Sequence, residues 1–252
     1  MKTKYPVEAF ALAIILMSAT LKEALVAGIL VFLAASAGVV IKLAMGKGEE
    51  KDIVSGCVAA VVGAAAFYAA FVVVLGAEAT WQTLASYAFI GLLAGKFVYE
   101  DTICNEVSAF SKESIIAYIM MLIIACVREF WGAGALLGSE LIKANFTTSS
   151  ISSAMFGLIF AGLALGFTNM IVKKEASFNS LFVVVPAAIV VIPVNINSAP
   201  AAVNVILGAA LAAIIMLAFK NRLTFSVTKK AFRSLPVELV CAGIAFMVMS
   251  VI

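Results

Sequence analysis

Histidine is absent from this 252-residue chain, and charged side chains are scarce. The absence of histidine removes the commonest general base and the commonest metal ligand of proteins. Only 12% of the residues are charged and 64% are hydrophobic, whereas a soluble domain is typically about one quarter charged and about half apolar. So few polar residues do not cover the surface of a water-soluble enzyme, a nucleic-acid-binding protein or a disordered chain. The composition therefore predicts a protein whose main partner is the lipid bilayer.

Long uncharged intervals separate the few charges. A bilayer core about 30 Å thick takes about 20 helical residues. Four intervals each fit one crossing, namely residues 24–41, 53–77, 79–95 and 144–172. A fifth, residues 176–219, is about twice the length of one crossing and must turn. The polar residues and proline at 195–200 predict the position of that turn.

Three shorter apolar stretches, residues 9–21, 114–127 and 239–252, complete the set. Residues 9–21 are too few for a comfortable crossing, which predicts a half-helix or a re-entrant segment. The expected fold class is an all-α polytopic membrane bundle with eight or nine membrane segments, at least one of them broken or re-entrant.

The basic residues predict the orientation. With nine segments threaded alternately, all but three of the 17 basic residues fall on one side, the exceptions being Lys22, Arg128 and Lys143. Cytoplasmic loops carry the excess of Lys and Arg. We therefore expect a multi-pass protein of a prokaryotic cytoplasmic (inner) membrane, with the N-terminus inside and the C-terminus outside.

The four cysteines show no C-x-x-C spacing. Cys57, Cys126 and Cys241 fit small apolar positions in helices. Cys104 differs because it stands among polar residues that include Asp101, so it is either a redox or ligand residue or an ordinary exposed thiol.

Charges near the ends of apolar segments are the other candidates. Arg128 and Glu129 precede an aromatic and glycine-rich run, which fits either an interfacial anchor or an ion or substrate pathway. Glu238 lies just inside the last apolar segment, after Pro236. It fits either an ion or proton site or an interfacial ion pair with Arg233.

Residues 123–130 and 216–223 have a similar sequence pattern. Each is an apolar segment that ends in a short polar stretch containing an arginine. The basic-residue count places their ends on opposite sides of the membrane. Related segments of opposite orientation are typical of inverted-topology repeats, which place functional sites at broken helices near the midplane. The polar residues Asn195, Asn197 and Asn204 lie near such a break.

The chain resembles the small integral subunits of the ion-pumping Rnf and Nqr electron-transport complexes. Residues 127–136, VREFWGAGAL, are similar to the V-R-E-hydrophobic-x-G-x-G-x-L segment of the RnfE/NqrD type, and residues 109–112 to its A-F-A-S-K stretch. The partner type, RnfA/NqrE, is matched in its R-L, F-K, P-I and A-G-L pattern by residues 222–244 and in an N-I-N by residues 195–197. The resemblance divides the chain into an RnfE/NqrD-like region, 1–175, and an RnfA/NqrE-like region, 176–252.

In that family, cysteines of two partner subunits of opposite topology hold an iron–sulfur cluster inside the membrane. The first family cysteine has no counterpart between Ala13 and Met17, the second aligns with Asp101 beside Cys104, and the partner-type position is Pro186. At most one ligand position, Cys104, is kept. The cofactor is therefore left open, and a cluster would need ligands from other chains, either other subunits of a redox complex or a second copy.

The resemblance implies a divergent membrane subunit of an Rnf/Nqr-like electron-transfer or ion-translocating complex. It would be at most an electron-relay or non-catalytic subunit, and it either shares a cluster or lacks one. The alternatives are a small-solute or ion transporter on the same inverted-repeat scaffold, and an assembly partner without a site of its own. No nucleic-acid partner is expected.

Overall fold

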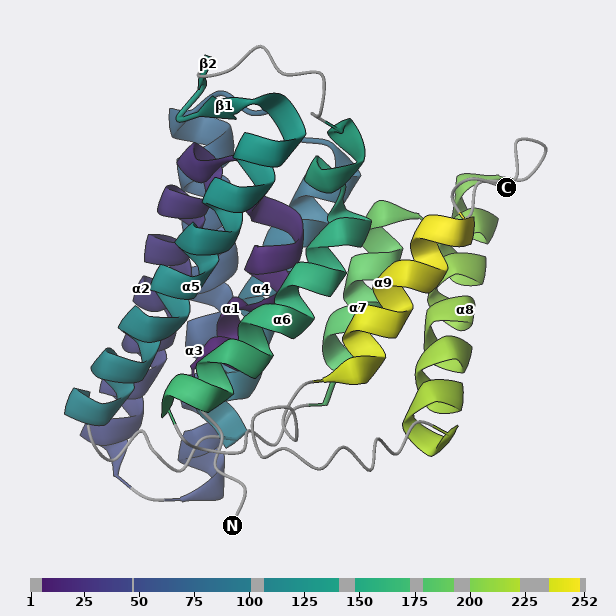
Figure 1. Ribbon diagram of the computed structural model, residues 1–252. Helices are drawn as coiled ribbons and strands as arrows, with labels where there is room; N and C mark the ends of the chain where they lie inside the picture. The colour runs from purple at the N-terminus through teal and green to yellow at the C-terminus, as the bar shows by residue number, and fades with distance from the viewer. Residues whose placement is uncertain are drawn as a thin grey trace.

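The computed structural model describes residues 6–46, 48–100, 107–140, 148–172, 179–192, 200–222 and 236–249, and these form a helical bundle (Figure 1). Its helices are α1 (Val7–Met17), α2 (Leu21–Met45), α3 (Glu49–Phe67), α4 (Trp81–Glu100), α5 (Val107–Ala133), α6 (Ala154–Val172), α7 (Leu181–Val191), α8 (Ala201–Arg222) and α9 (Val237–Met249). The π-helix η1 (Tyr68–Val74) extends α3, and the short 3-10 helix η3 (Ser149–Ser152) precedes α6. A small hairpin of β1 (Ala135–Leu136) and β2 (Ser139–Glu140) follows α5.

Among the described residues, five helices are long and apolar enough to cross a membrane: Leu21–Met45, Glu49–Val74, Ser108–Ala133, Ala154–Val172 and Ala201–Ala218. Their outer faces carry large apolar side chains, such as Val61 and Ile206, each with 68% of its surface exposed. An apolar face of this kind suits lipid and not water. The prediction of an all-α, multi-pass membrane protein is confirmed at this level.

Successive helices run in alternating directions between two ends of the bundle (Figure 1). The hairpin end holds Lys22, whose ammonium lies close to Gly138, and Arg128 near the end of α5. At the opposite end Lys42 donates to the carbonyl oxygen of Val98 at 2.8 Å and pairs with Asp52 at 3.1 Å. Lys22 and Arg128 thus lie at one end of the bundle and Lys42 at the other.

The short helix α1 is enclosed by other helices. Every residue from Val7 to Ile15 has 3% or less of its surface exposed. Its 11 residues span about 16 Å at 1.5 Å per residue, roughly half of a bilayer core. The chain then breaks and restarts as α2 at Leu21. The prediction that residues 9–21 do not form a full crossing agrees with this break.

The long interval 176–219 is divided between two helices, α7 and α8. α7 ends at Val191, Ile192 adopts a left-handed φ of 48°, and α8 begins at Ala201. The intervening residues 193–199, with Asn195 and Asn197, lie outside the described residues. The two segments of similar pattern, which end α5 and α8, run in opposite directions. α5 ends at the hairpin, and α8 ends at the other end of the bundle (Figure 1).

Candidate functional site: a broken helix between two charged clusters

The break after α1 leaves carbonyl groups without helical partners inside the protein. The last four carbonyl groups of any α-helix lack an intrahelical donor, and in α1 they begin at Ile14. A buried carbonyl without a donor costs about 1–3 kcal/mol. The Ser18 hydroxyl donates back to the carbonyl of Ile14. A side chain from another helix donates to the carbonyl groups of Ile14 and Ile15 as well.

That side chain is Arg128, which is fully buried. Nη1 lies 3.1 Å from the carbonyl oxygen of Ile14, 3.4 Å from that of Ile15 and 2.6 Å from the Ser18 hydroxyl oxygen. On the other side of the guanidinium, three carbonyl oxygens of the segment leading into α6 accept hydrogen bonds: Ile151 from Nε at 3.2 Å, and Ser152 and Ser153 from Nη2 at 2.9 and 2.8 Å.

These contacts fit the chemistry of an arginine and of a helix end. A guanidinium has five N–H donors in a rigid fork, and the six acceptors around Arg128 are enough to engage all of them. The carbonyl end of α1 also carries the negative end of the helix dipole, which favours a cation. Arg128 therefore joins α1, α5 and the start of α6.

Glu129 makes the complementary contacts. Its carboxylate accepts hydrogen bonds from the backbone N–H of Leu21 and of Gly138, both at 2.9 Å. Leu21 is the first residue of α2, where N–H groups lack partners and the dipole favours an anion. Gly138 belongs to the hairpin turn, in which Leu137 and Gly138 both have positive φ, 54° and 76°. Glu129 thus ties α5 to α2 and to the hairpin.

The interfacial-anchor interpretation of Arg128 and Glu129 is therefore wrong, since 0% and 4% of their surfaces are exposed. They are buried because they satisfy the two backbone ends at the α1–α2 break. Trp131, which is 48% exposed, keeps a position suited to an aromatic belt. A role of the pair in an ion or substrate pathway remains a prediction.

A second charged cluster lies at the start of α1. Lys96 of α4 pairs with Glu8 and with Glu100, each at an N–O distance of 2.9 Å. Glu8 is nearly enclosed, with 4% of its side chain exposed, whereas Glu100 has 28%. The Lys96 ammonium also lies 4.7 Å from the ring centroid of Phe182 in α7. Sequence reasoning missed this cluster, although the i, i+4 spacing of Lys96 and Glu100 on one helix is visible in the sequence.

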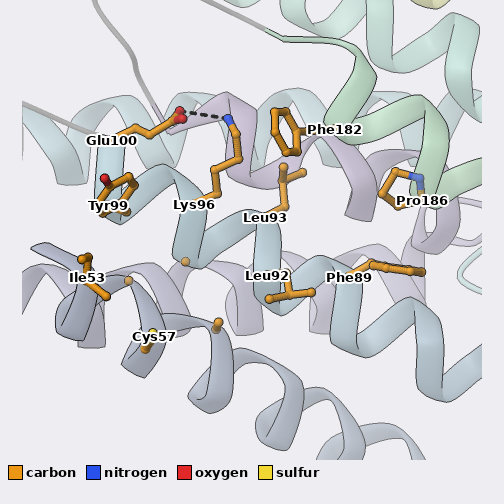
Figure 2. A pocket seen from close by; sticks show the side chains of 13 residues that line it. Ile53, Cys57, Phe89, Leu92, Leu93, Lys96, Tyr99, Glu100, Phe182 and Pro186 are labelled. Atoms are coloured by element: carbon orange, nitrogen blue, oxygen red, sulfur yellow. Dashed lines mark hydrogen bonds and ion pairs between the residues drawn. The ribbon is translucent and has the colours of Figure 1, made fainter. Parts of the chain in front are cut away.

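A cavity of about 610 Å³ adjoins this cluster, between α3, α4 and α7. Figure 2 shows Lys96 and Glu100 at one end of it and Phe89 and Pro186 toward the other. Cys57, an exposed free thiol of α3, lies in its wall. The cavity is therefore apolar along most of its length and charged at one end.

The other predicted site residues are not gathered here. Cys104, Asp101, Asn195 and Asn197 lie outside the described residues. Glu238 accepts a hydrogen bond from the Ser180 hydroxyl at 3.0 Å, which joins the start of α9 to the start of α7. Its alternative partner, Arg233, is also outside the described residues.

The described residues contain no group of three or more His, Cys, Asp and Glu side chains placed to hold a metal ion. Cys57, Cys126 and Cys241 stand on three different helices, α3, α5 and α9. The remaining cysteine, Cys104, lies outside the described residues. Comparison of the chain with family models, with curated proteins and with solved structures gives no match.

Proposed function

We propose that the chain is a divergent membrane subunit of an Rnf/Nqr-like electron-transfer or ion-translocating complex. The observation that carries the proposal is the place of the V-R-E segment in the structure. Arg128 and Glu129, the two charged residues of that segment, bind the two backbone ends at the α1–α2 break. One segment that carries the resemblance thus supports the end of α1 and the start of α2.

Inverted-repeat membrane proteins place ion and substrate sites where helices end inside the membrane and their backbone ends face charged groups. Here one end of α1 meets Arg128 and the other meets Lys96 through Glu8. We take the bundle as nine membrane segments in two related parts, 1–175 and 176–252, with the N-terminus in the cytoplasm of a prokaryote and the C-terminus outside. The positive-inside rule supports this orientation.

In this proposal the chain acts as an electron-relay or scaffold subunit and any iron–sulfur cluster is shared. Cys104, with Asp101 close by, is the proposed ligand of such a cluster. The remaining ligands come from a partner subunit or a second copy. When bound, the cluster would supply one-electron transfer across the membrane. This chain would supply one ligand and the helix frame.

The test is anaerobic purification of the native assembly, followed by iron analysis and EPR spectroscopy, in matched Cys104→Ser and Cys126→Ser variants. We expect redox subunits to co-purify, and a reduced-state signal that is lost in Cys104→Ser and kept in Cys126→Ser. A native preparation free of iron, redox signal and other subunits would overturn the proposal.

A transporter of a small solute or ion is the second candidate. The Glu8–Lys96 ion pair at the start of the short buried helix α1 favours it, because charges buried in a membrane protein often mark ion pathways. Proteoliposomes that accumulate radiolabelled Na⁺ in response to a gradient, with uptake reduced in Asn195→Ala and Asn197→Ala, would support this candidate. Uptake no faster than that of empty liposomes would exclude Na⁺ as the cargo.

A further inference from the structure

The cavity between α3, α4 and α7 is a groove with one charged end, and its length is that of a single membrane leaflet. Phe89 and Glu100, at its two ends (Figure 2), are both on α4. Their separation along the helix is about 16 Å at 1.5 Å per residue, close to half of a bilayer core about 30 Å thick. The walls between them are built mainly from apolar and small residues, including Leu92 and Ala60.

The charged end of the groove coincides with helix termini. Glu100 is the last residue of α4, and Phe182 is the second residue of α7. The Lys42–Asp52 ion pair, formed between the end of α2 and the first turn of α3, belongs to the same end of the bundle, since Lys42 also donates to Val98 of α4. This is the level at which membrane helices reach the polar headgroups. The groove therefore runs from headgroup level toward the middle of the bilayer.

The charge at that end of the groove determines which lipid headgroup fits it. Among the described partners Glu8, Lys96 and Glu100, Glu100 is the most exposed, with 28% of its side chain accessible against 16% for Lys96 and 4% for Glu8. The group presented at the mouth of the groove is thus a carboxylate. An ionised carboxylate offers about four acceptor sites, so it can accept from a ligand while it remains paired with Lys96. A headgroup with a primary ammonium suits it, whereas a purely anionic headgroup meets a like charge.

We infer that the groove holds one acyl chain of an aminophospholipid of the phosphatidylethanolamine type, whose ammonium group pairs with Glu100. The lipid fills an apolar cavity of about 610 Å³ beside α7 and so supports the contact of α7 with α4. This inference does not depend on the redox or transport role proposed above.

The first test uses the whole chain in nanodiscs with equal amounts of phosphatidylethanolamine, phosphatidylcholine and phosphatidylglycerol. After transfer to mild detergent, mass spectrometry counts the lipid retained by each protein molecule. We expect phosphatidylethanolamine to be retained in preference to both others. The choline headgroup has no N–H donor, so retention equal to that of phosphatidylcholine, or a preference for phosphatidylglycerol, would overturn the assignment of the headgroup.

Variants then locate the lipid. Cys57→Trp places a large ring in the wall of the groove and should abolish selective retention. Val61→Trp is the matched control, because Val61 lies one turn further along α3, is 68% exposed and is not part of the wall. Glu100→Gln should reduce the preference for phosphatidylethanolamine over phosphatidylcholine about three- to fivefold, as for a partly exposed ion pair. Equal retention in Cys57→Trp and Val61→Trp, with both variants monodisperse, would place the lipid elsewhere.

Discussion

Nη1 of Arg128 lies 3.1 Å from the carbonyl oxygen of Ile14, although 114 residues separate the two along the chain. The contact joins the end of the buried helix α1 to α5, and Arg128 reaches the segment before α6 with the opposite side of its guanidinium. A single side chain thus supplies donors to two breaks in the helical backbone. In lipid no water can replace those donors, so the bundle depends on this residue.

Arg128→Lys should destabilise the protein severely even though the charge is kept. An ammonium has three donors on one nitrogen and does not reproduce the five-donor fork of a guanidinium. We expect the free energy of unfolding to fall by about 3 kcal/mol or more, as for other broken buried polar networks. The thermal unfolding midpoint in detergent measures this effect. Lys22→Gln, an exposed cation at the same end of the bundle, is the control and should shift the midpoint little; equal shifts would show that Arg128 supports no break.

Glu129→Gln should remove one of the two hydrogen bonds that the Glu129 carboxylate accepts. An amide retains one acceptor oxygen but turns an NH₂ group toward the other donor, so either Leu21 or Gly138 loses its partner. The expected loss is about 1–3 kcal/mol. Glu140→Gln, at an exposed position in the same hairpin, should change stability by no more than about 0.5 kcal/mol. Comparable losses in the two variants would contradict the assigned contacts.

Gly157→Ala should displace α1. A methyl group at Gly157 would meet the carbonyl oxygen of Ile15 and would lie 2.9 Å from the Ile15 Cα, both of them backbone atoms that no rotamer change can move. At Gly162, on the same helix, the nearest atom is a side-chain methyl of Val240 at 2.8 Å. Overpacking typically costs about 1–3 kcal/mol, and we expect Gly157→Ala to be the more damaging substitution in thermal unfolding. A larger effect at Gly162 would show that α1 does not approach α6 as closely as described.

The apolar intervals predicted most of the helices, because burial in lipid requires a helix wherever about 20 apolar residues are uncharged. The break before Leu21 could also be predicted from the sequence, since residues 9–21 are too few to cross the bilayer core. The hairpin after α5 was not, because it consists of two strands of two residues each, which is too short for a periodic pattern.

The candidate site was only partly predictable. Arg128 and Glu129 stood out as charges at the end of an apolar run, but adjacent residues on a helix point in different directions, and their partners are backbone groups far away in sequence. Backbone acceptors such as the Ile14 and Ser153 carbonyls leave no trace in residue identity. The same holds for the Glu8–Lys96 pair, whose members are 88 residues apart.

The orientation proposed for the bundle can be tested with two single-cysteine variants in a cysteine-free background. Glu49→Cys lies at the start of α3 and Glu140→Cys in the hairpin, and both positions are exposed at opposite ends of the bundle (Figure 1). In intact cells a membrane-impermeant maleimide should label Glu140→Cys alone, and disruption of the cells should expose Glu49→Cys. Labelling of Glu49→Cys in intact cells would reverse the orientation.

Lys96→Met should leave Glu8 as an enclosed carboxylate without the ion pair that now faces it. Glu8 has 4% of its side chain exposed and lies 2.9 Å from the Lys96 ammonium. Removal of one partner of a buried pair typically costs about 3–5 kcal/mol, because the other charge stays buried. The second substitution Glu8→Gln should then restore part of the stability, since it removes that charge. Lys112→Met, at an exposed position of α5, is the control for loss of a cation. If the double variant is no more stable than Lys96→Met, the cost arises from lost packing against Phe182 and not from the charge of Glu8.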